Sequence, residues 1–133
     1  MTDDPTLEGL PQDLVQRYLR MLGLTQEPPS LEALARLTRA HILAVPFENV
    51  SSILRARAGG GAPASPVDPE TELDAWASQR GGGVCFEVAD TFSRLLIALG
   101  YRAHPVLCES SFPGSHQAIL VDLGGEMKSR VRA

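Results

Sequence analysis

The 133-residue chain is 44% hydrophobic and 21% charged, an ordinary composition for a globular protein with room for one modest core. Its formal net charge of −4 argues against nucleic acid or an anionic membrane as a partner, because both reward clustered Lys and Arg. No apolar run approaches the roughly 18 residues of a membrane span, and Met1 to Pro5 is acidic where a signal peptide is basic. We therefore expect a cytoplasmic protein.

The chain has two cysteines, Cys85 and Cys108. The cytoplasm is reducing, and structural disulfides are rare there. We therefore expect two free thiols rather than one bridge.

Two helices are predicted near the N-terminus. Residues 11–23 place apolar side chains on one helical stripe and end at a glycine, which is typical of a short amphipathic helix. Ser30 follows two prolines and opens a second helix over 31–41 as its N-cap. The inner face of this second helix is expected to hold Leu31, Leu34, Leu37 and Ile42.

The next segment alternates turns and loops with one short helix. Pro46 disfavours the α region for the residue before it, so residues 44–49 are expected to extend or turn. Residues 57–69 are rich in Gly, Pro and Ala without periodicity, as in an exposed loop. Residues 70–79 follow as a predicted helix. Its inward side chains are expected to be Leu73 and Trp76.

A glycine run at residues 81–83 delivers Cys85 onto the start of a helix with an apolar stripe that ends at Gly100. A cysteine in the first helical turn lies among unpaired N–H groups at the positive end of the dipole, which favours the thiolate. A free cysteine is more often inert packing, and the glycine-rich approach is what singles out Cys85 as a nucleophile.

Two strands follow the cysteine helix. Residues 101–108 and 116–123 both have the period of a strand, and Gly124-Gly125 is a hairpin signal. Residues 126–133 are polar and basic and lack alternation, so we expect no proper return strand. The strand at 116–123 would then be an exposed edge through which copies of the chain self-associate.

These elements predict an α+β fold. An N-terminal helical bundle is followed by a cysteine-bearing helix packed on the start of an antiparallel sheet or barrel, as in transglutaminase-like and cysteine-protease-like folds. We divide the chain into a helical region, residues 1–78, and a second region, residues 79–133. This second region holds the cysteine helix and the first strands of an incomplete β-barrel.

A thiol nucleophile needs a base, and the chain offers three histidines. His41 lies near a helix end, where a solvated or dipole-pairing role is favoured. His104 precedes a proline in a strand and is expected at its edge or face. His116 begins the second strand, where it can reach a helix across the sheet. A Cys at a helix start with a His about 30 residues later is the arrangement of papain-like and transglutaminase-like sites.

Neither of the two carboxylates considered, Asp122 and Asp90, is expected to lie where it could orient His116. Asp122 lies six residues along the same strand, about 20 Å away at roughly 3.3 Å per residue. Asp90 points to a different side of the helix from Cys85.

Several motifs follow one another along the chain in a specific order. They are Tyr18-Leu19-Arg20, Leu31, Leu34, His41, Val45-Pro46-Phe47-Glu48-Asn49, Arg80-Gly81-Gly82, Cys85-Phe86-Glu87, Phe92, Leu95, Leu99-Gly100-Tyr101, His116, Leu120 and Val121. Together these positions resemble the arylamine N-acetyltransferase family. The resemblance implies acetyl transfer from acetyl-CoA to an arylamine or arylhydrazine through an acetyl-Cys85 thioester, with His116 as base and no metal. Phe47 and Val84 would contact the acceptor substrate.

The chain also departs from the family pattern. Arg80 and Cys85 are one residue further apart than usual, and Ala89 and Asp90 stand where an Asn is common. Family members continue into a third strand with a triad aspartate and a C-terminal region that helps hold coenzyme A. We therefore expect a truncated and impaired enzyme. Two alternatives stay open, namely a cysteine hydrolase or transglutaminase-like enzyme with the same pair, and a non-catalytic remnant or interaction module.

Overall fold

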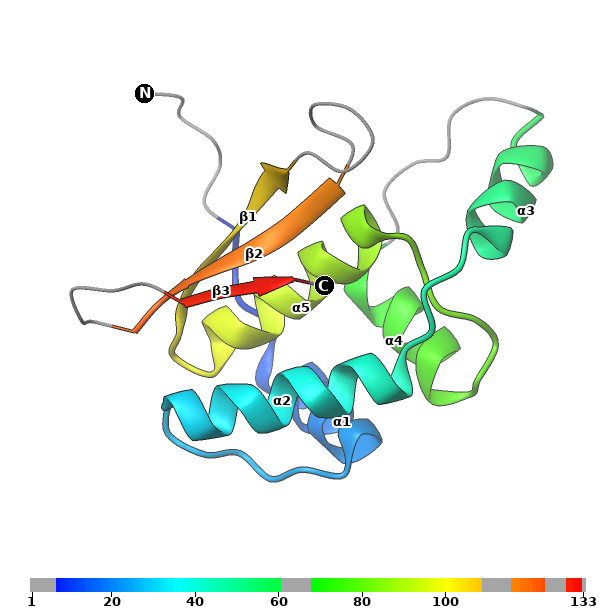
Figure 1. The fold of residues 1–133 in the computed structure, drawn as a ribbon. Coiled ribbons are helices and arrows are strands. Elements are labelled where there is room, and N and C mark those ends of the chain that lie inside the picture. The colour runs from blue at the N-terminus through cyan, green and yellow to red at the C-terminus, as the bar shows by residue number, and fades with distance from the viewer. Residues whose placement is uncertain (1–6, 61–67, 109–115, 124–128, 133) are drawn as a thin grey trace.

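The computed structural model describes residues 7–60, 68–108, 116–123 and 129–132. Within these ranges, helix α5 lies between a three-stranded antiparallel sheet and the helix pair α1 and α2 (Figure 1). This arrangement confirms the predicted mixture of helices with a small antiparallel sheet. None of the helices in these ranges is long and apolar enough to cross a membrane. The helices are α1 (Gln12–Leu22), α2 (Leu31–Ala44), α3 (Val50–Ala58), α4 (Pro69–Ala77) and α5 (Cys85–Ala98), and the strands are β1 (Arg102–Cys108), β2 (His116–Asp122) and β3 (Ser129–Arg132).

Local signals set the ends of α1 and α2. Gly23 closes α1 in the left-handed conformation at φ 74°, which glycine adopts without a steric penalty. The Ser30 hydroxyl accepts a hydrogen bond from the Ala33 amide at 3.0 Å, so the predicted N-cap is confirmed. The predicted inner face of α2 is partly wrong, because Leu31 and Ile42 are 58% and 60% exposed. The buried stripe of α2 is Ala33, Leu34, Leu37 and His41.

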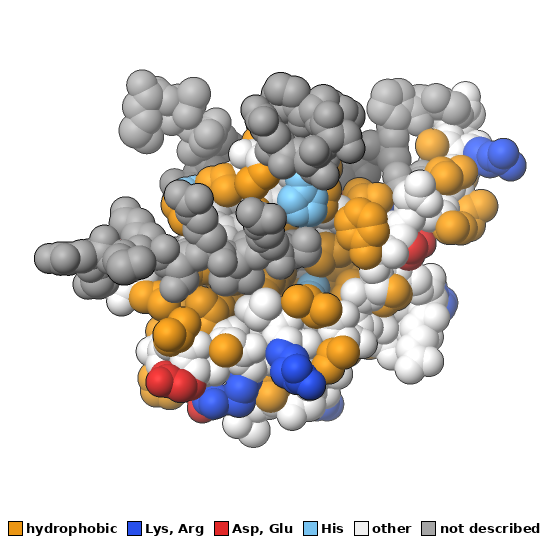
Figure 2. All heavy atoms as spheres, in the orientation of Figure 1, with side chains coloured by type: hydrophobic (Ala, Val, Ile, Leu, Met, Phe, Trp, Pro, Cys, Tyr) orange, Lys and Arg blue, Asp and Glu red, His pale blue; other side chains and the backbone are white. Residues whose placement is uncertain are grey.

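Helix α3 begins directly after the 44–49 turn and extends into the start of the segment predicted as a loop. Its apolar side chains Val50, Ile53 and Leu54 recur at helical spacing but are all about half exposed. Figure 2 shows orange side chains gathered over this helix at the edge of the molecule. An ion pair between Arg55 and Glu87 ties α3 to the start of α5.

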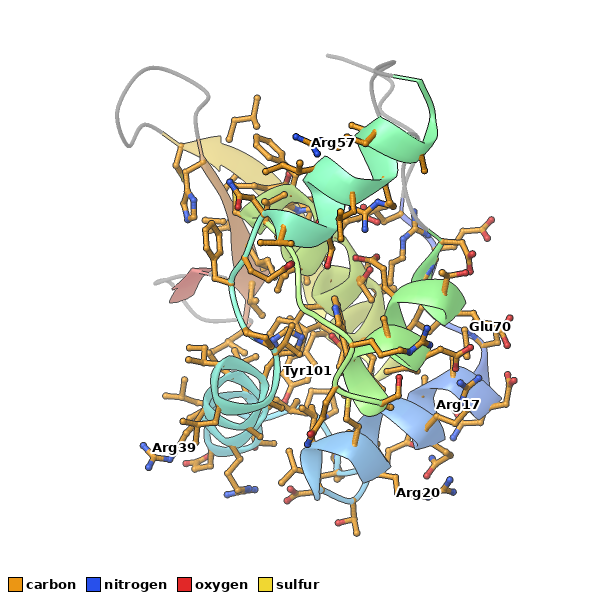
Figure 3. All side chains as sticks on the ribbon, turned by 90° about the vertical axis from the view of Figure 1, so that its right-hand side faces the viewer. Arg17, Arg20, Arg39, Arg57, Glu70 and Tyr101 are labelled. Carbon is orange, nitrogen blue, oxygen red and sulfur yellow. The ribbon has the colours of Figure 1, made fainter. Side chains whose placement is uncertain are left out.

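Asp68 is the N-cap of helix α4, and its carboxylate accepts a hydrogen bond from the Glu70 amide at 2.9 Å. Leu73 and Trp76 are buried, as predicted. On the outer side, Arg17 of α1 extends toward Glu70, with Nη1 3.4 Å from the carboxylate (Figure 3). Such an exposed pair contributes at most about 1 kcal/mol. The position of α4 therefore depends mainly on its buried side chains.

The apolar core joins α1, α2, α4, α5 and the sheet in one cluster. Helix α5 is central to it, because it contacts both β1 and β2 on one side and α1 on the other. The largest side chains with almost no exposed surface are Tyr18, Phe92, Leu19, Leu34, Leu73, Leu95, Leu96 and Ile119.

The sheet has the order β1-β2-β3. Strands β1 and β2 pair from Arg102 opposite Asp122 to Cys108 opposite His116. The prediction that no third strand forms is wrong, because β3 pairs with residues 118–121 of β2. Ladder hydrogen bonds join backbone groups, so residues 129–132 can pair although only one of the four is apolar. The predicted self-association through a bare β2 edge loses its basis. The turns at 112–115 and 124–125 lie outside the described residues.

Glu72 of α4 is a buried carboxyl group that makes stability depend on pH. Its Oε1 accepts a hydrogen bond from Thr91 Oγ1 at 2.5 Å. Burial raises the pKa of Glu72 from 4.5 to about 7, helped by the nearby charges of Glu87 and Asp90. Between pH 4.5 and 7 the folded protein therefore holds a proton that the unfolded chain releases. The free energy of unfolding falls as pH rises through this window.

We expect Glu72→Gln to stabilise the fold at pH 8 by up to about 3 kcal/mol, because the amide needs no proton to be buried. The variant and the wild type should converge near pH 4.5. Urea unfolding at several pH values measures the difference in the free energy of unfolding. His41 is present in both proteins, so its titration cancels from this difference. The exposed Glu70→Gln is the control and should follow the wild type. If the free energy of unfolding changed with pH in the same way in the wild type and in Glu72→Gln, the raised pKa of Glu72 would be contradicted.

Candidate functional site

The glycine run (residues 81–83) pairs with the turn around Pro46 (residues 44–49), which we call the Pro46 corner. Together they form one backbone unit ahead of α5. The Gly83 amide donates to the Pro46 carbonyl at 3.2 Å, and the Glu48 amide donates to the Gly83 carbonyl at 3.1 Å. A Cβ on Gly82 would lie 1.7 Å from the Pro46 carbonyl oxygen, so only glycine fits there. Trp76 Nε1 donates to the Gly82 carbonyl at 3.2 Å. Contacts from α4 and the corner thus fix the backbone that leads to Cys85.

Cys85 is the first residue of α5 and is 5% exposed. Glu87 caps this helix, because its Oε1 accepts from the Val84 amide at 3.1 Å. The other Glu87 oxygen is paired with Arg55. The Glu87 carboxylate is therefore occupied by a helix amide and a guanidinium. Cys85 lies at the positive end of the α5 dipole.

Helix α5 and the sheet have matching lengths, so their ends coincide. The 14 residues of α5 rise about 21 Å, and a 7-residue strand spans about 23 Å. The chain turns back between α5 and β1, and β2 turns back again. Cys108 and His116, which are partners in the register, therefore lie at the end where Cys85 begins α5. Figure 1 shows the start of β2 beside the start of α5.

The structure brings Cys85 and His116 to one end of the fold. No hydrogen bond joins them among the described residues. His116 is half-buried. By strand alternation it shares a face with Ala118, whereas the core residue Ile119 lies on the other face. Transfer of the thiol proton to His116 requires the imidazole to come within hydrogen-bond reach of Cys85.

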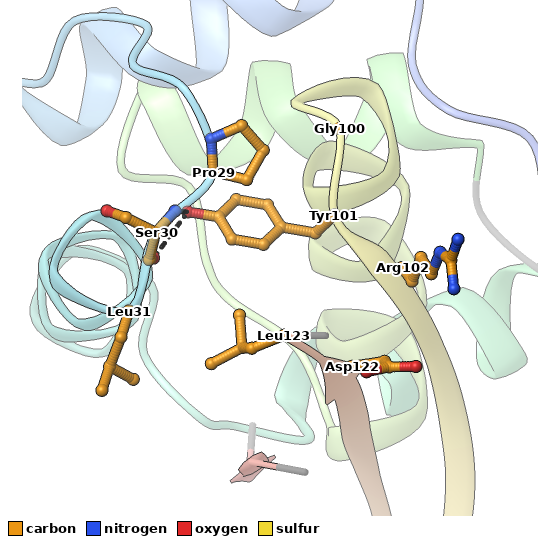
Figure 4. A pocket seen from close by; sticks show the side chains of 8 residues that line it. All are labelled: Pro29, Ser30, Leu31, Gly100, Tyr101, Arg102, Asp122 and Leu123. Atoms are coloured by element: carbon orange, nitrogen blue, oxygen red, sulfur yellow. Dashed lines mark hydrogen bonds between the residues drawn. The ribbon is translucent and has the colours of Figure 1, made fainter. Parts of the chain in front are cut away.

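The other acids and histidines considered from the sequence lie elsewhere. Asp122 is opposite Arg102 at the far end of the sheet, where it borders a separate pocket of about 520 Å³ (Figure 4). There the Tyr101 hydroxyl donates to the Ser30 carbonyl at 3.1 Å. Asp90 accepts from Arg94 Nε at 3.1 Å. His104 is exposed on β1, and Cys85 and Cys108 are both free thiols.

The expectation that His41 is solvated is wrong. Its side chain is 4% exposed, and its Nε2 lies 2.5 Å from the Tyr18 hydroxyl oxygen. The ring packs on Phe92 with centroids 4.3 Å apart and meets Trp76 edge to face. Burial lowers the pKa of His41 from 6.5 to about 4, so the imidazole is neutral at pH 7. The buried stripe of α2 therefore ends with His41 and not with the predicted Ile42.

A pocket of about 180 Å³ opens beside α5. Val88 and Phe92 line it and follow Cys85 at three and seven residues, which places all three on one helix face. Phe47 lines it from the corner and is 69% exposed. Val84, the other expected substrate contact, is the N-cap of α5 rather than part of this lining. Helical spacing from Cys85 was the sequence signal for Val88 and Phe92. The remaining lining comes from α2 and the corner, through Thr38, His41, Ile42, Val45 and Pro46.

Comparison with known proteins gives consistent matches. An arylamine N-acetyltransferase of Mycobacterium bovis is 29% identical over 132 aligned positions, covering 84% of this chain and 44% of that protein. An arylamine N-acetyltransferase / N-hydroxyarylamine O-acetyltransferase of Salmonella typhimurium is 32% identical over 111 positions, covering 74% of this chain and 35% of that one. The chain thus spans less than half the length of these relatives.

The fold and the family agree. The solved arylamine N-acetyltransferase from Salmonella typhimurium matches with a TM-score of 0.71 at 26% identity, covering 90% of this chain and 43% of that chain. A family model described as N-acetyltransferase matches residues 30–126, which include the Pro46 corner, Cys85 and His116. On this evidence, the chain belongs to the arylamine N-acetyltransferase family.

Proposed function

We propose that this chain transfers an acetyl group from acetyl-CoA to an arylamine or arylhydrazine through a thioester on Cys85. The observation that carries the proposal is the place of Cys85, at the first position of α5 and at the same end of the fold as His116. Residues 79–133 would hold the reacting pair, and residues 1–78 would supply Phe47 at the acceptor pocket. Membership in the N-acetyltransferase family supports the reaction class.

The first half of the reaction acylates the enzyme. The His116 imidazole takes the Cys85 thiol proton, and the thiolate attacks the carbonyl carbon of acetyl-CoA. The carbon–sulfur bond to coenzyme A then breaks, and His116 returns the proton to the departing thiolate. The Cys85 and Phe86 amides at the start of α5 stabilise negative charge on the Cys85 sulfur, because neither has a backbone acceptor among the described residues.

The second half regenerates the thiol. The acceptor nitrogen attacks the acetyl carbonyl on Cys85, a new carbon–nitrogen bond forms, and the carbon–sulfur bond breaks. His116 takes the amine proton and passes it to the Cys85 sulfur. Phe47, Val88 and Phe92 offer aromatic and aliphatic surface for the ring of the acceptor, next to the helix turn that carries the thioester. Val84 would contact the acceptor near the thiol.

Alkylation tests which thiol reacts. We expect iodoacetamide to modify Cys85 faster than Cys108, although Cys108 is the more exposed of the two, because only Cys85 lies on a helix N-terminus. Preincubation with acetyl-CoA should protect Cys85 alone. Peptide mapping of the wild type measures both rates, and Cys108→Ser is the control that should leave the Cys85 rate unchanged. Preferential labelling of Cys108, or no protection of Cys85, would refute the proposed nucleophile.

A further inference from the structure

Tyr18 and His41 determine where each other's protons lie. Burial, with a smaller effect from Glu72, raises the pKa of Tyr18 well above its usual value, so its hydroxyl keeps its proton. The partner of this hydroxyl among the described residues is His41 Nε2 at 2.5 Å. A phenol proton needs an acceptor, so Tyr18 donates and Nε2 accepts. The neutral imidazole then carries its one proton on Nδ1.

The 180 Å³ pocket is lined by His41, whose Nδ1 carries this proton. Nδ1 has no hydrogen-bond partner in the described part of the chain. The buried side-chain atoms that lack a partner there are Glu48 Oε2, Arg55 Nε and Ser93 Oγ, and His41 Nδ1 is not one of them. Nδ1 is therefore reachable from outside, and His41 lines the pocket. The pocket thus contains one N–H donor on an otherwise largely apolar wall.

We propose that His41 Nδ1–H selects the acceptor substrate by donating a hydrogen bond to a neutral acceptor atom at the end of the ring opposite the amine. This inference rests on the proposed function. The imidazole packs on Phe92, and Phe92 lies seven residues after Cys85, about 10 Å along α5. A benzene ring with substituents at opposite ends can bridge such a span, with its amine toward Cys85.

The chemistry of the pocket favours an uncharged acceptor group. His41 is a neutral donor, and the residues lining the pocket carry no cationic side chain. The Thr38 hydroxyl already donates to the Leu34 carbonyl at 2.9 Å. A carboxylate would lose its hydration without gaining an opposite charge, whereas a ketone or ester oxygen needs only the one donor. His41 therefore specifies arylamines with a neutral carbonyl para to the amine.

Binding of three para-substituted anilines to the full chain, without any acyl donor, tests this inference. We expect 4-aminoacetophenone to bind about tenfold more tightly than 4-isopropylaniline, which lacks the acceptor oxygen, and than 4-aminobenzoate, which is charged. Calorimetric or protein-detected NMR titration measures the three affinities. Equal affinities, tighter binding of the carboxylate, or no binding of any of the three would overturn the inference.

Two substitutions of His41 distinguish the effect of its N–H donor from the effect of its side-chain volume. His41→Asn and His41→Leu both remove the acceptor for Tyr18, but only Asn retains an N–H near the position of Nδ1. We expect His41→Leu to abolish the preference for the ketone and His41→Asn to keep most of it. Thr38→Val is the control and should keep all of it. Loss of the preference in Thr38→Val, or its survival in His41→Leu, would count against His41. If either His41 variant fails to fold, the three ligands on the wild type still decide.

The same ligands distinguish this inference from the proposed function. A preserved preference for the ketone with no acetyl transfer to Cys85 would contradict the reaction and support His41 as the selecting donor. Acetyl transfer that proceeds equally well with all three amines would support the reaction and contradict the role of His41.

Discussion

Gly82→Ala is expected to destabilise the fold by about 3 kcal/mol or more and to remove any reactivity of Cys85. The added Cβ would lie 1.7 Å from the Pro46 carbonyl oxygen and 2.7 Å from its carbon. These are backbone atoms, so relief requires the corner and the glycine run to separate. Separation would break the hydrogen bonds between Pro46, Gly83 and Glu48 and move the start of α5. Urea unfolding and iodoacetamide labelling measure the two effects.

Gly59→Ala is the matched control for this substitution. Gly59 has an ordinary φ of −87°, and an added Cβ there would lie 3.6 Å from the Arg55 carbonyl oxygen, which is an ordinary van der Waals contact. The free energy of unfolding of this variant should lie within about 0.5 kcal/mol of the wild-type value. A Gly82→Ala protein with wild-type stability would show that the corner does not dock on the glycine run as described.

Acetylation of an arylamine by the 133-residue polypeptide is expected to be about 10⁴-fold slower than an ordinary enzyme rate on the order of 10 per second. The reason is that no carboxylate among the described residues hydrogen-bonds His116, and Asp122 lies at the opposite end of β2. An imidazole without such a partner is held in neither the required tautomer nor the required orientation. Acetylation of Cys85 should suffer less, because the helix N-terminus supports the thiolate independently of His116.

Single-turnover and steady-state assays separate the two steps. Formation of acetyl-Cys85 is followed by mass, and amine acetylation is followed by the product. Coenzyme A release that continues without amine would indicate transfer to water and therefore a hydrolase. Turnover of an arylamine near 10 per second would contradict the prediction and mean that another group orients His116.

Local chemistry made the ends of the helices predictable. The cap at Ser30 and the stop at Gly23 each depend on one residue and its immediate neighbours. The first residue of α5 was equally local, because the glycine run and the apolar stripe behind Cys85 mark the same boundary. These features agree between sequence and structure for that reason.

Features that depend on distant partners were not predictable in the same way. Helix α3 has helical spacing in Val50, Ile53 and Leu54, but these side chains are exposed, and an ion pair between Arg55 and Glu87 links it to α5. Strand β3 forms by backbone pairing with β2, which the pattern of its side chains does not predict. In both cases the deciding contact lies in another element.

His41 shows how tertiary contacts change the meaning of a residue. On its own helix it is a polar side chain near the C-terminal end, where a solvated role is normal. In the fold, Tyr18 from α1, Trp76 from α4 and Phe92 from α5 converge on it. No single-element pattern could have brought these three rings together. The pocket that His41 borders is a product of the same convergence.

Intact mass spectrometry of the chain with acetyl-CoA tests the central claim most directly. We predict that the wild type and Cys108→Ala each gain the mass of one acetyl group, that peptide mapping places it on Cys85, and that Cys85→Ala gains none. Addition of an arylamine should slowly remove the acetyl group from Cys85. An acetyl group that appears on Cys108, persists in Cys85→Ala, or never forms in a folded wild type would contradict Cys85 as the acyl-accepting nucleophile.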